Sequence, residues 1–169
     1  IWPPLSLMNC AAILERQGHD ACILDAHALR LSAEQIPSRL QGYDKIFITS
    51  SCLDRWQCPP PDIAPFLETV KKARQVTDEI YVMGYHGTLD PGGLLKLTQA
   101  KAVLSGEPEG IIEALGEGKP WPDIPGLTYL SGGETISSSR DRQDWDLRSA
   151  PLPAYHRIDR RAYSYEILG

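Results

Sequence analysis

Short apolar runs alternate with amphipathic segments along the first two thirds of the chain. The apolar runs, typical of buried strands, lie at residues 21–25, 45–50, 80–83 and 101–105. Between them, apolar residues recur at helical spacing around residues 7–14, 66–73, 94–97 and 111–115. Strands that alternate with helices at this rhythm predict an α/β fold, with a parallel sheet and flanking helices. The near-continuous apolar content of the strands indicates burial on both faces of that sheet.

Residues with strong helix-end preferences mark the boundaries of the predicted helices. A proline pair precedes the first helix and Gly18 follows it, at the ends where proline and glycine are favoured. Ser32 and Gln35 match a capping box, whereas Pro37 predicts that the helix around it is short or irregular. The alternation opens with a helix. We therefore expect the strand that should precede this helix to lie upstream of residue 1 or to be missing.

The character of the sequence changes after residue 116, and we divide the chain at residue 118. Residues 1–118 are expected to form the α/β domain. Residues 119–169 open with a linker rich in proline and glycine. Two short β-type runs follow, Leu127–Leu130 and Glu134–Ile136, separated by Ser-Gly-Gly, which predicts a β-hairpin. The last residues are typical of a lead-in to a further domain.

Composition and charge narrow the class of protein. Of the 169 residues, 42% are apolar and 23% are charged, as in ordinary globular domains. The net charge of −5 argues against a nucleic-acid surface, because neutralising phosphates requires clustered Lys and Arg. No apolar run approaches the length of a membrane span, and the sequence opens without a signal-peptide pattern. We therefore expect a cytoplasmic protein without a membrane span.

The four cysteines, Cys10, Cys22, Cys52 and Cys58, match no zinc or redox motif. A scattered set of this kind in an α/β chain indicates free thiols. Cys10 and Cys22 fall in apolar patterns and are expected to pack in the core. Cys52 and Cys58 are expected to be exposed, in a loop that follows the strand at residues 45–50.

Polar and small residues follow three of the predicted strands at the point where each strand ends. Thr49, Ser50 and Ser51 end one strand, a polar loop is expected after Gly84 at the end of the next, and residues 105–107 follow the last. In open parallel sheets, ligands bind outside the carboxyl ends of the strands. The sequence therefore predicts that these three strand ends form one ligand platform.

The residue types on this platform allow more than one role. Hydroxyl groups can bind a phosphate, a ribose or a heterocycle nitrogen, although at a strand end they more often cap their own backbone. His86 could donate to a ligand, ligate a metal or brace its loop. No second ligand stands at metal-binding spacing, so a metal site made by the protein alone is not expected. Carboxylates at Glu107 and Glu109 would also suit the start of a helix.

Neither standard phosphate-binding motif is present in the sequence. No GxGxxG follows a strand, and no GxxxxGK[ST] occurs. A dinucleotide-binding or P-loop protein therefore has no direct support from the sequence.

Seven segments carry a family resemblance through their order along the chain. They are residues 3–20, 23–26, 46–51, 82–88, 103–109, 124–129 and 152–156. In that order they resemble the patterns PPLGL…GHEV, VLDA, VGISS, VGGPHAT, VVRGEGE, IPGLSYR and LPFPAYH. These patterns belong to the N-terminal cobalamin (B12)-binding domain of B12-dependent radical SAM enzymes, and the resemblance covers almost the whole chain.

This resemblance implies a Rossmann-like (flavodoxin-like) fold with cobalamin laid over the carboxyl ends of the strands. The residues carried over by position fall into three groups, one for each strand end. The first group would line the nucleotide tail, the second would contact the tail or the corrin edge, and the third would form a further wall. The groups are Thr49, Ser50, Ser51 and Leu53; Gly84, Tyr85, His86 and Gly87; and Gly106, Glu107 and Pro108.

The resemblance also implies what a longer protein would add. The CxxxCxxC motif that holds a [4Fe-4S] cluster in the family is absent, so this chain is not expected to be active alone. The cluster and S-adenosylmethionine would belong to a downstream radical SAM domain, acting on a small-molecule or peptide substrate. Methyl transfer is the commonest reaction that the resemblance implies. The family's DxHxxG motif, which supplies a histidine to cobalt, is absent as well.

Two other hypotheses stay open at this point. Met83 stands where the family has a glycine. This favours a degenerate Rossmann-like domain without cobalamin, acting as an interaction or substrate-gating module. The third hypothesis is a flavodoxin-like domain that binds a nucleotide or FMN at its switch point.

Overall fold

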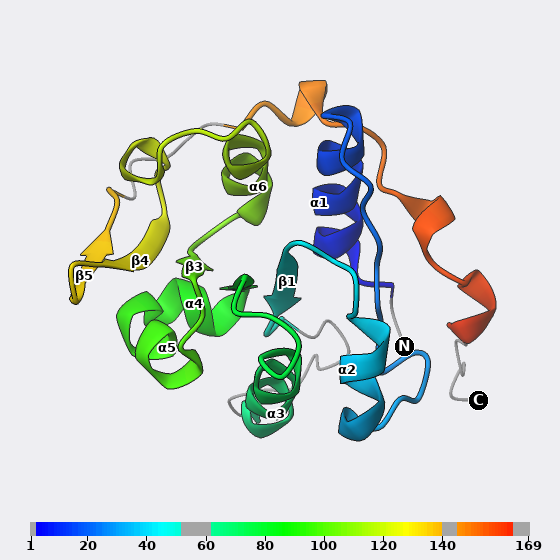
Figure 1. The fold of residues 1–169 in the computed structure, drawn as a ribbon. Helices are drawn as coiled ribbons and strands as arrows, with labels where there is room; N and C mark the ends of the chain where they lie inside the picture. The colour runs from blue at the N-terminus through cyan, green and yellow to red at the C-terminus, as the bar shows by residue number, and fades with distance from the viewer. Residues whose placement is uncertain (1–2, 52–61, 140–144, 164–169) are drawn as a thin grey trace.

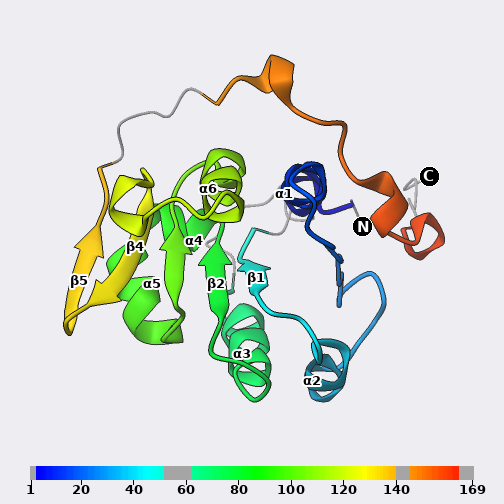
Figure 2. The same ribbon diagram turned by 45° about the horizontal axis from the view of Figure 1, so that its top comes forward.

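A computed structural model describes residues 3–51, 62–139 and 145–163 of the chain. The described residues form one five-stranded sheet in the order β1-β2-β3-β4-β5 (Figures 1 and 2). Strands β1 (Ile46–Thr49), β2 (Ile80–Met83) and β3 (Ala102–Leu104) are parallel. Strands β4 (Leu127–Ser131) and β5 (Glu134–Ser137) continue the sheet antiparallel. The predicted α/β class is confirmed.

Helices cover both faces of the sheet, and each face has its own apolar core. On one face, α1 (Leu5–Arg16) and α6 (Pro108–Gly116) pack over Tyr81 and Met83. On the other face, α3 (Ala64–Ala73) and α5 (Pro91–Thr98) pack over Ile80 and Val82. Successive residues of β2 thus point to opposite faces, as a strand requires. All four are buried, which explains why the strand is an unbroken apolar run.

Shorter elements connect these layers. The two short α-helices are α2 (Ile36–Arg39) and α4 (Tyr85–Leu89). The 3₁₀ turns are η1 (Ala33–Gln35), η2 (Trp121–Asp123), η3 (Leu147–Ser149), η4 (Tyr155–Arg157) and η5 (Arg160–Ala162).

Several local predictions are confirmed. Helix α1 lies between Pro4 and Gly18, and Gly18 adopts a φ of +88° that favours glycine. The capping box forms at η1, where the backbone N–H of Ser32 donates to Oε1 of Gln35 at 2.9 Å. Helix α2, which contains Pro37, is limited to four residues. The hairpin of β4 and β5 forms as predicted, and Trp121 of η2 packs edge-on against Tyr129.

The strand predicted at residues 21–25 is wrong. These residues form no strand, because a strand is held by backbone bonds to a neighbour and no described strand pairs with them. Their apolar side chains are used differently. Ala21 and Ile23 pack against Ala11 and Ala12 of α1, and Oδ1 of Asp25 accepts a bond from a backbone N–H three residues later.

The polar loop predicted after Gly84 is also wrong, because residues 85–89 form helix α4. Two hydroxyls from the end of β1 supply the acceptors that the first turn of a helix requires. Oγ of Ser51 accepts from the N–H of Tyr85 at 3.1 Å, and Oγ of Ser50 accepts from the N–H of His86 at 3.3 Å. The helix thus depends on residues far away in the sequence.

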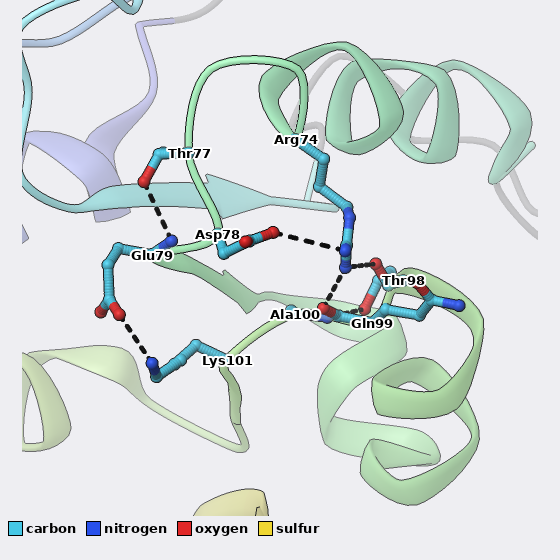
Figure 3. A network of polar contacts seen from close by, with 8 residues as sticks. All are labelled: Arg74, Thr77, Asp78, Glu79, Thr98, Gln99, Ala100 and Lys101. Atoms are coloured by element: carbon cyan, nitrogen blue, oxygen red, sulfur yellow. Dashed lines mark hydrogen bonds and ion pairs between the residues drawn. The ribbon is translucent and has the colours of Figure 1, made fainter.

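The amino ends of β2 and β3 are tied together by a polar network (Figure 3). The guanidinium of Arg74 donates to the carbonyls of Thr98 and Gln99 and to Oδ1 of Asp78, the last at 3.4 Å. Nearby, Nζ of Lys101 donates to Oε1 of Glu79 at 2.7 Å. We call this set of residues, 74, 77–79 and 98–101, the amino-edge network.

The segment from residue 145 to 163 returns across the α1 side of the molecule (Figure 2). The N–H of Ala154 donates to the carbonyl of Met8 at 3.1 Å, and the hydroxyl of Tyr163 donates to Asp25 at 2.9 Å. The carboxylate of Glu15 accepts from Arg157. Among the helices of the described ranges, none is both long and apolar enough to cross a bilayer.

Candidate functional site

A pocket of about 450 Å³ opens at the carboxyl edge of the parallel strands. Its walls come from the ends of β1, β2 and β3 and from the first turns of α1 and α6, which the sequence places far apart. The lining residues are Ser6, Thr49, Ser51, Met83, Gly84, Tyr85, Thr88, Gly106, Glu107, Pro108 and Glu109. The predicted meeting of three strand ends is therefore present in the structure.

Gly84 lets two of these strand ends approach closely. Its φ is +103°, a conformation that other residues rarely adopt. A Cβ on Gly84 would lie 2.7 Å from Oγ of Ser51, and 3.0 Å or less from the backbone nitrogens of Ser50 and Ser51. The glycine thus makes room for the neighbouring strand end rather than for the pocket.

The hydroxyls at the end of β1 each accept a hydrogen bond from a backbone N–H. Besides the two serines that receive α4, Oγ1 of Thr49 accepts from the N–H of Ser51 at 3.1 Å. These hydroxyls therefore cap backbone N–H groups, which is the role that competes with ligand binding at a strand end. A hydroxyl that accepts one bond still has a proton to donate. Thr49 and Ser51 line the pocket and can direct that proton into it.

A chain of hydrogen bonds joins the end of β3 to helix α4. The N–H of Gly106 donates to Oγ1 of Thr88 at 2.9 Å, and Oγ1 of Thr88 donates to the carbonyl of Gly84 at 3.1 Å. Behind the pocket, Oγ of Ser105 donates to the carbonyl of Gly87 at 2.9 Å. These bonds fix the walls relative to one another, so the pocket is largely preformed.

The third wall of the pocket is acidic. Glu107 and Glu109 line it beside the start of α6, where carboxylates favour the positive end of the helix dipole. Nδ2 of Asn9 donates to Oε1 of Glu109 at 3.2 Å and connects α1 to α6 at this rim. No lysine or arginine stands among the described lining residues. The described lining therefore offers acceptors and hydroxyl donors and holds no fixed cation.

The predicted site residues do not all reach the pocket. The ones that line it are Thr49, Ser51, Gly84, Tyr85, Gly106, Glu107 and Pro108. Ser50 and Gly87 are buried behind the wall, where Ser50 caps α4 and Gly87 packs against Val103. His86 is outside the lining, and its Nδ1 is buried without a hydrogen-bond partner in the described structure. Leu53 lies outside the described residues.

Sequence reasoning missed Ser6, Thr88 and Glu109 as site residues. Ser6 follows the proline pair that opens α1, and only the packing of α1 against α6 brings it to the pocket. Thr88 stands in the segment predicted as a polar loop, and it is helix α4 that brings its side chain to the pocket. Glu109 could have been predicted as a site residue, because it stands beside Glu107 in the first turn of the predicted last helix.

The described residues hold no group of three or more His, Cys, Asp or Glu that could bind a metal ion. Burial raises the pKa of the Cys10 thiol, so this cysteine is an inert part of the core, as predicted. Cys22 is exposed, unlike the prediction from its apolar surroundings, because residues 21–25 are not in the sheet. Cys52 and Cys58 lie outside the described residues.

Comparisons with known proteins find similarity in structure alone. No family model matches the sequence, and no curated protein matches it. Two solved structures of TsrM, a radical S-adenosylmethionine methyltransferase from Kitasatospora setae, match with a TM-score of 0.68 and 18% identity. One has tryptophan substrate and a SAM analogue bound, and covers 84% of this chain. The other has cobalamin and a [4Fe-4S] cluster bound, and covers 89%.

The chain corresponds to 28% of the length of each of these TsrM structures. At this level of identity the similarity shows the fold. It is the same Rossmann-like α/β arrangement that the sequence predicts, and it extends over most of the described chain.

Proposed function

We propose that this chain is the cobalamin-binding module of a B12-dependent radical SAM enzyme. The observation that carries the proposal is the preformed pocket at the carboxyl edge of β1, β2 and β3. It lies where ligands bind in open α/β sheets. The fold around it resembles that of a protein whose structure contains cobalamin.

The size of the pocket fits part of the cofactor. Ligand pockets typically measure about 300–1,000 Å³, and this one measures about 450 Å³. That is enough for a nucleotide-sized group but not for a whole corrin. We therefore propose that the nucleotide tail enters the pocket and that the corrin lies over its mouth. The exposed ring of Tyr85 stands at that mouth and offers an apolar surface to the corrin edge.

The charged and polar groups of the pocket also suit cobalamin. Cobalamin carries many carboxamide side chains, which donate N–H bonds, and its phosphate is a diester with a single negative charge. Glu107 and Glu109 are suited to accept from carboxamides, and the hydroxyls of Thr49 and Ser51 are suited to donate to sugar or phosphate oxygens. FMN is a weaker fit, because its phosphate monoester carries up to two charges and the described lining holds no Lys or Arg to neutralise them.

When bound, cobalamin supplies a cobalt centre that can carry a methyl group. The residues of this chain bind and orient the cofactor, and the hydrogen-bonded walls hold that orientation. Iron–sulfur and S-adenosylmethionine chemistry would belong to a separate radical SAM domain, since the printed sequence has no CxxxCxxC motif. We propose methyl transfer to a small molecule or peptide as the reaction of the whole enzyme.

Equilibrium dialysis with three compounds tests the proposal. Hydroxocobalamin is expected to bind. Dicyanocobinamide, which lacks the nucleotide tail, should bind at least about tenfold more weakly, and FMN should not bind. Binding of FMN but not cobalamin would favour the flavodoxin-like alternative. A folded protein that binds none of the three would favour the degenerate module, in which Met83 occupies the place of a family glycine.

A further inference from the structure

Met83, the last residue of β2, closes the inner end of the pocket. It lines the pocket and yet is only 1% exposed, whereas every other described lining residue is at least partly exposed. Tyr85, two residues further on, is 54% exposed. A lining side chain that solvent hardly reaches lies at the bottom of a pocket. Met83 is therefore the floor of the pocket, and Tyr85 stands at the mouth.

This floor is continuous with the apolar core behind it. The side chain of Met83 points to the face of the sheet on which α1 and α6 lie side by side (Figure 2). There it belongs to one cluster with Ile13 of α1, Leu104 of β3 and Ile111 of α6. Because the first turns of the same two helices contribute to the walls, Met83 separates the pocket from this core.

The backbone of Met83 is held on both sides. The residue is in register with Thr49 of β1 and with Leu104 of β3, and its carbonyl accepts from the N–H of Ser50 at 2.9 Å. Only the end of its flexible side chain can adjust. The thioether is at most a weak acceptor and donates no hydrogen bond. Met83 thus limits the depth of the pocket and gives it an apolar inner end.

The polar groups of the lining stand on the more exposed residues. The hydroxyls come from residues such as Thr49 and Ser51. The carboxylates come from Glu107 and Glu109. A ligand that matches this order has its polar groups nearer the mouth and an apolar group at its inner end. An aromatic ring suits that end best, because methionine sulfur makes favourable contacts with aromatic rings.

Cofactors of the cobalamin type, the cobamides, differ in the base that ends the nucleotide tail. In cobalamin the far ring of the base is a hydrocarbon ring with methyl groups. In a cobamide with adenine as its base, the corresponding ring carries ring nitrogens and an amino group. Against an apolar floor these polar groups would lose their hydrogen bonds to water without gaining new ones. The two bases should therefore bind with different affinity.

We propose, resting on the function proposed above, that Met83 determines which base the pocket accepts. Its apolar floor selects a cobamide with a dimethylbenzimidazole base and disfavours one with a purine base. The hydroxyls and carboxylates of the walls bind the rest of the tail and do not make this distinction.

Equilibrium dialysis with hydroxocobalamin and the adenine cobamide tests this. The wild type should bind hydroxocobalamin at least about tenfold more tightly. Met83→Gln has a side chain of similar length and offers an amide to the base, so the preference should fall to about threefold or less. Met83→Leu keeps an apolar floor of similar size and should retain the preference.

A third cofactor makes the test independent of whether the glutamine variant folds. A cobamide with a p-cresol base ends in an aromatic ring with a methyl group and no polar edge. The wild type should bind it within about threefold of hydroxocobalamin. Three results would overturn this role of Met83 alone. They are equal binding of hydroxocobalamin and the adenine cobamide, equal loss of preference in both variants, and binding of the p-cresol cobamide as weak as that of the adenine cobamide. A folded wild type that binds no cobamide would overturn the proposed function, and this role with it.

Discussion

The two ends of the parallel strands use similar polar groups in different ways. At the amino edge, the guanidinium of Arg74 donates hydrogen bonds to two carbonyls and a carboxylate of the protein itself (Figure 3). At the carboxyl edge, within the described residues, Thr49 and Ser51 each accept one bond and keep a proton beside an open pocket. Polar groups that are paired internally hold the sheet together. Polar groups that line a pocket and make only some of their possible hydrogen bonds remain available to a ligand.

The carboxylates show the same difference. At the amino edge the hydrogen bond from Lys101 lowers the pKa of Glu79, which also accepts from Tyr81. At the carboxyl edge Glu109 accepts a bond from Asn9 and faces the pocket beside Glu107. The amino edge should therefore respond to substitution mainly in stability, and the carboxyl edge mainly in binding. Gly84 is the exception, because it holds the carboxyl edge together.

The largest effect is expected for Gly84→Ala. The new Cβ would collide with Ser51 while the backbone is held at φ +103°. We expect a loss of about 2–3 kcal/mol in the free energy of unfolding, from backbone strain and displaced strand ends. Urea denaturation measures it. Gly42→Ala is the matched control, since Gly42 has a φ of +87° with no atom near its Cβ position, and should lose only about 1 kcal/mol. Equal losses would contradict the close approach at Gly84.

The next effect is expected for Arg74→Ala at the amino edge. Removing the guanidinium leaves the carbonyls of Thr98 and Gln99 without this donor, at a cost of about 1–2 kcal/mol in unfolding free energy. Cobalamin binding, measured by equilibrium dialysis, should not change. Arg161→Ala is the control, because among the described residues the guanidinium of Arg161 bonds to the nearby Asp159 alone, on the surface. A clear loss of binding in the folded Arg74 variant would contradict the division of roles between the two edges.

A smaller effect, on affinity, is expected for Glu109→Gln. The variant keeps a side-chain oxygen for Asn9 but loses the charge that strengthens bonds from ligand carboxamides. Its dissociation constant for hydroxocobalamin should rise about two- to tenfold, with the unfolding free energy changed by less than about 1 kcal/mol. Glu117→Gln, at the other end of α6 and outside the pocket lining, should change neither binding nor fold. Equal effects of the two variants would exclude a ligand contact at Glu109.

The smallest effect is a pH dependence of stability at the amino edge. Because the folded-state pKa of Glu79 lies below its ordinary value of 4.5, the stabilisation is complete above pH 4.5 and is lost as the pH falls through the folded-state pKa. The pair with Lys101 is partly exposed, so its contribution should be below about 1 kcal/mol. Unfolding free energies of the wild type and Glu79→Gln, measured between pH 3 and pH 7, should differ most at neutral pH. A constant difference would contradict the linkage.

The sequence was sufficient for elements that depend on local pattern. The apolar runs predicted β2 and β3 because buried parallel strands need apolar residues on both faces. The hairpin followed from two β-type runs around Ser-Gly-Gly, and α2 was short because Pro37 stands within it. Three strand ends were predicted to meet, because parallel strands share one carboxyl edge.

The sequence was insufficient where structure depends on distant partners. Helix α4 needs the hydroxyls of Ser50 and Ser51, which no local pattern around residue 85 reveals. Residues 21–25 have the composition of a strand, but no described strand pairs with them. Ser6 reaches the pocket only because α1 packs on α6. His86 stays outside the pocket lining because it lies in helix α4, where neighbouring residues point in different directions.

The most direct test of cofactor binding is the absorption spectrum of the protein after incubation with hydroxocobalamin and removal of free ligand by desalting. A carboxyl-edge pocket that holds cobalamin predicts corrin bands that stay with the protein at near-stoichiometric amount. The bands should weaken in Glu109→Gln and persist in Arg74→Ala. A folded, colourless protein at cobalamin concentrations well above those of the protein would contradict cobalamin binding and leave the pocket without its proposed ligand.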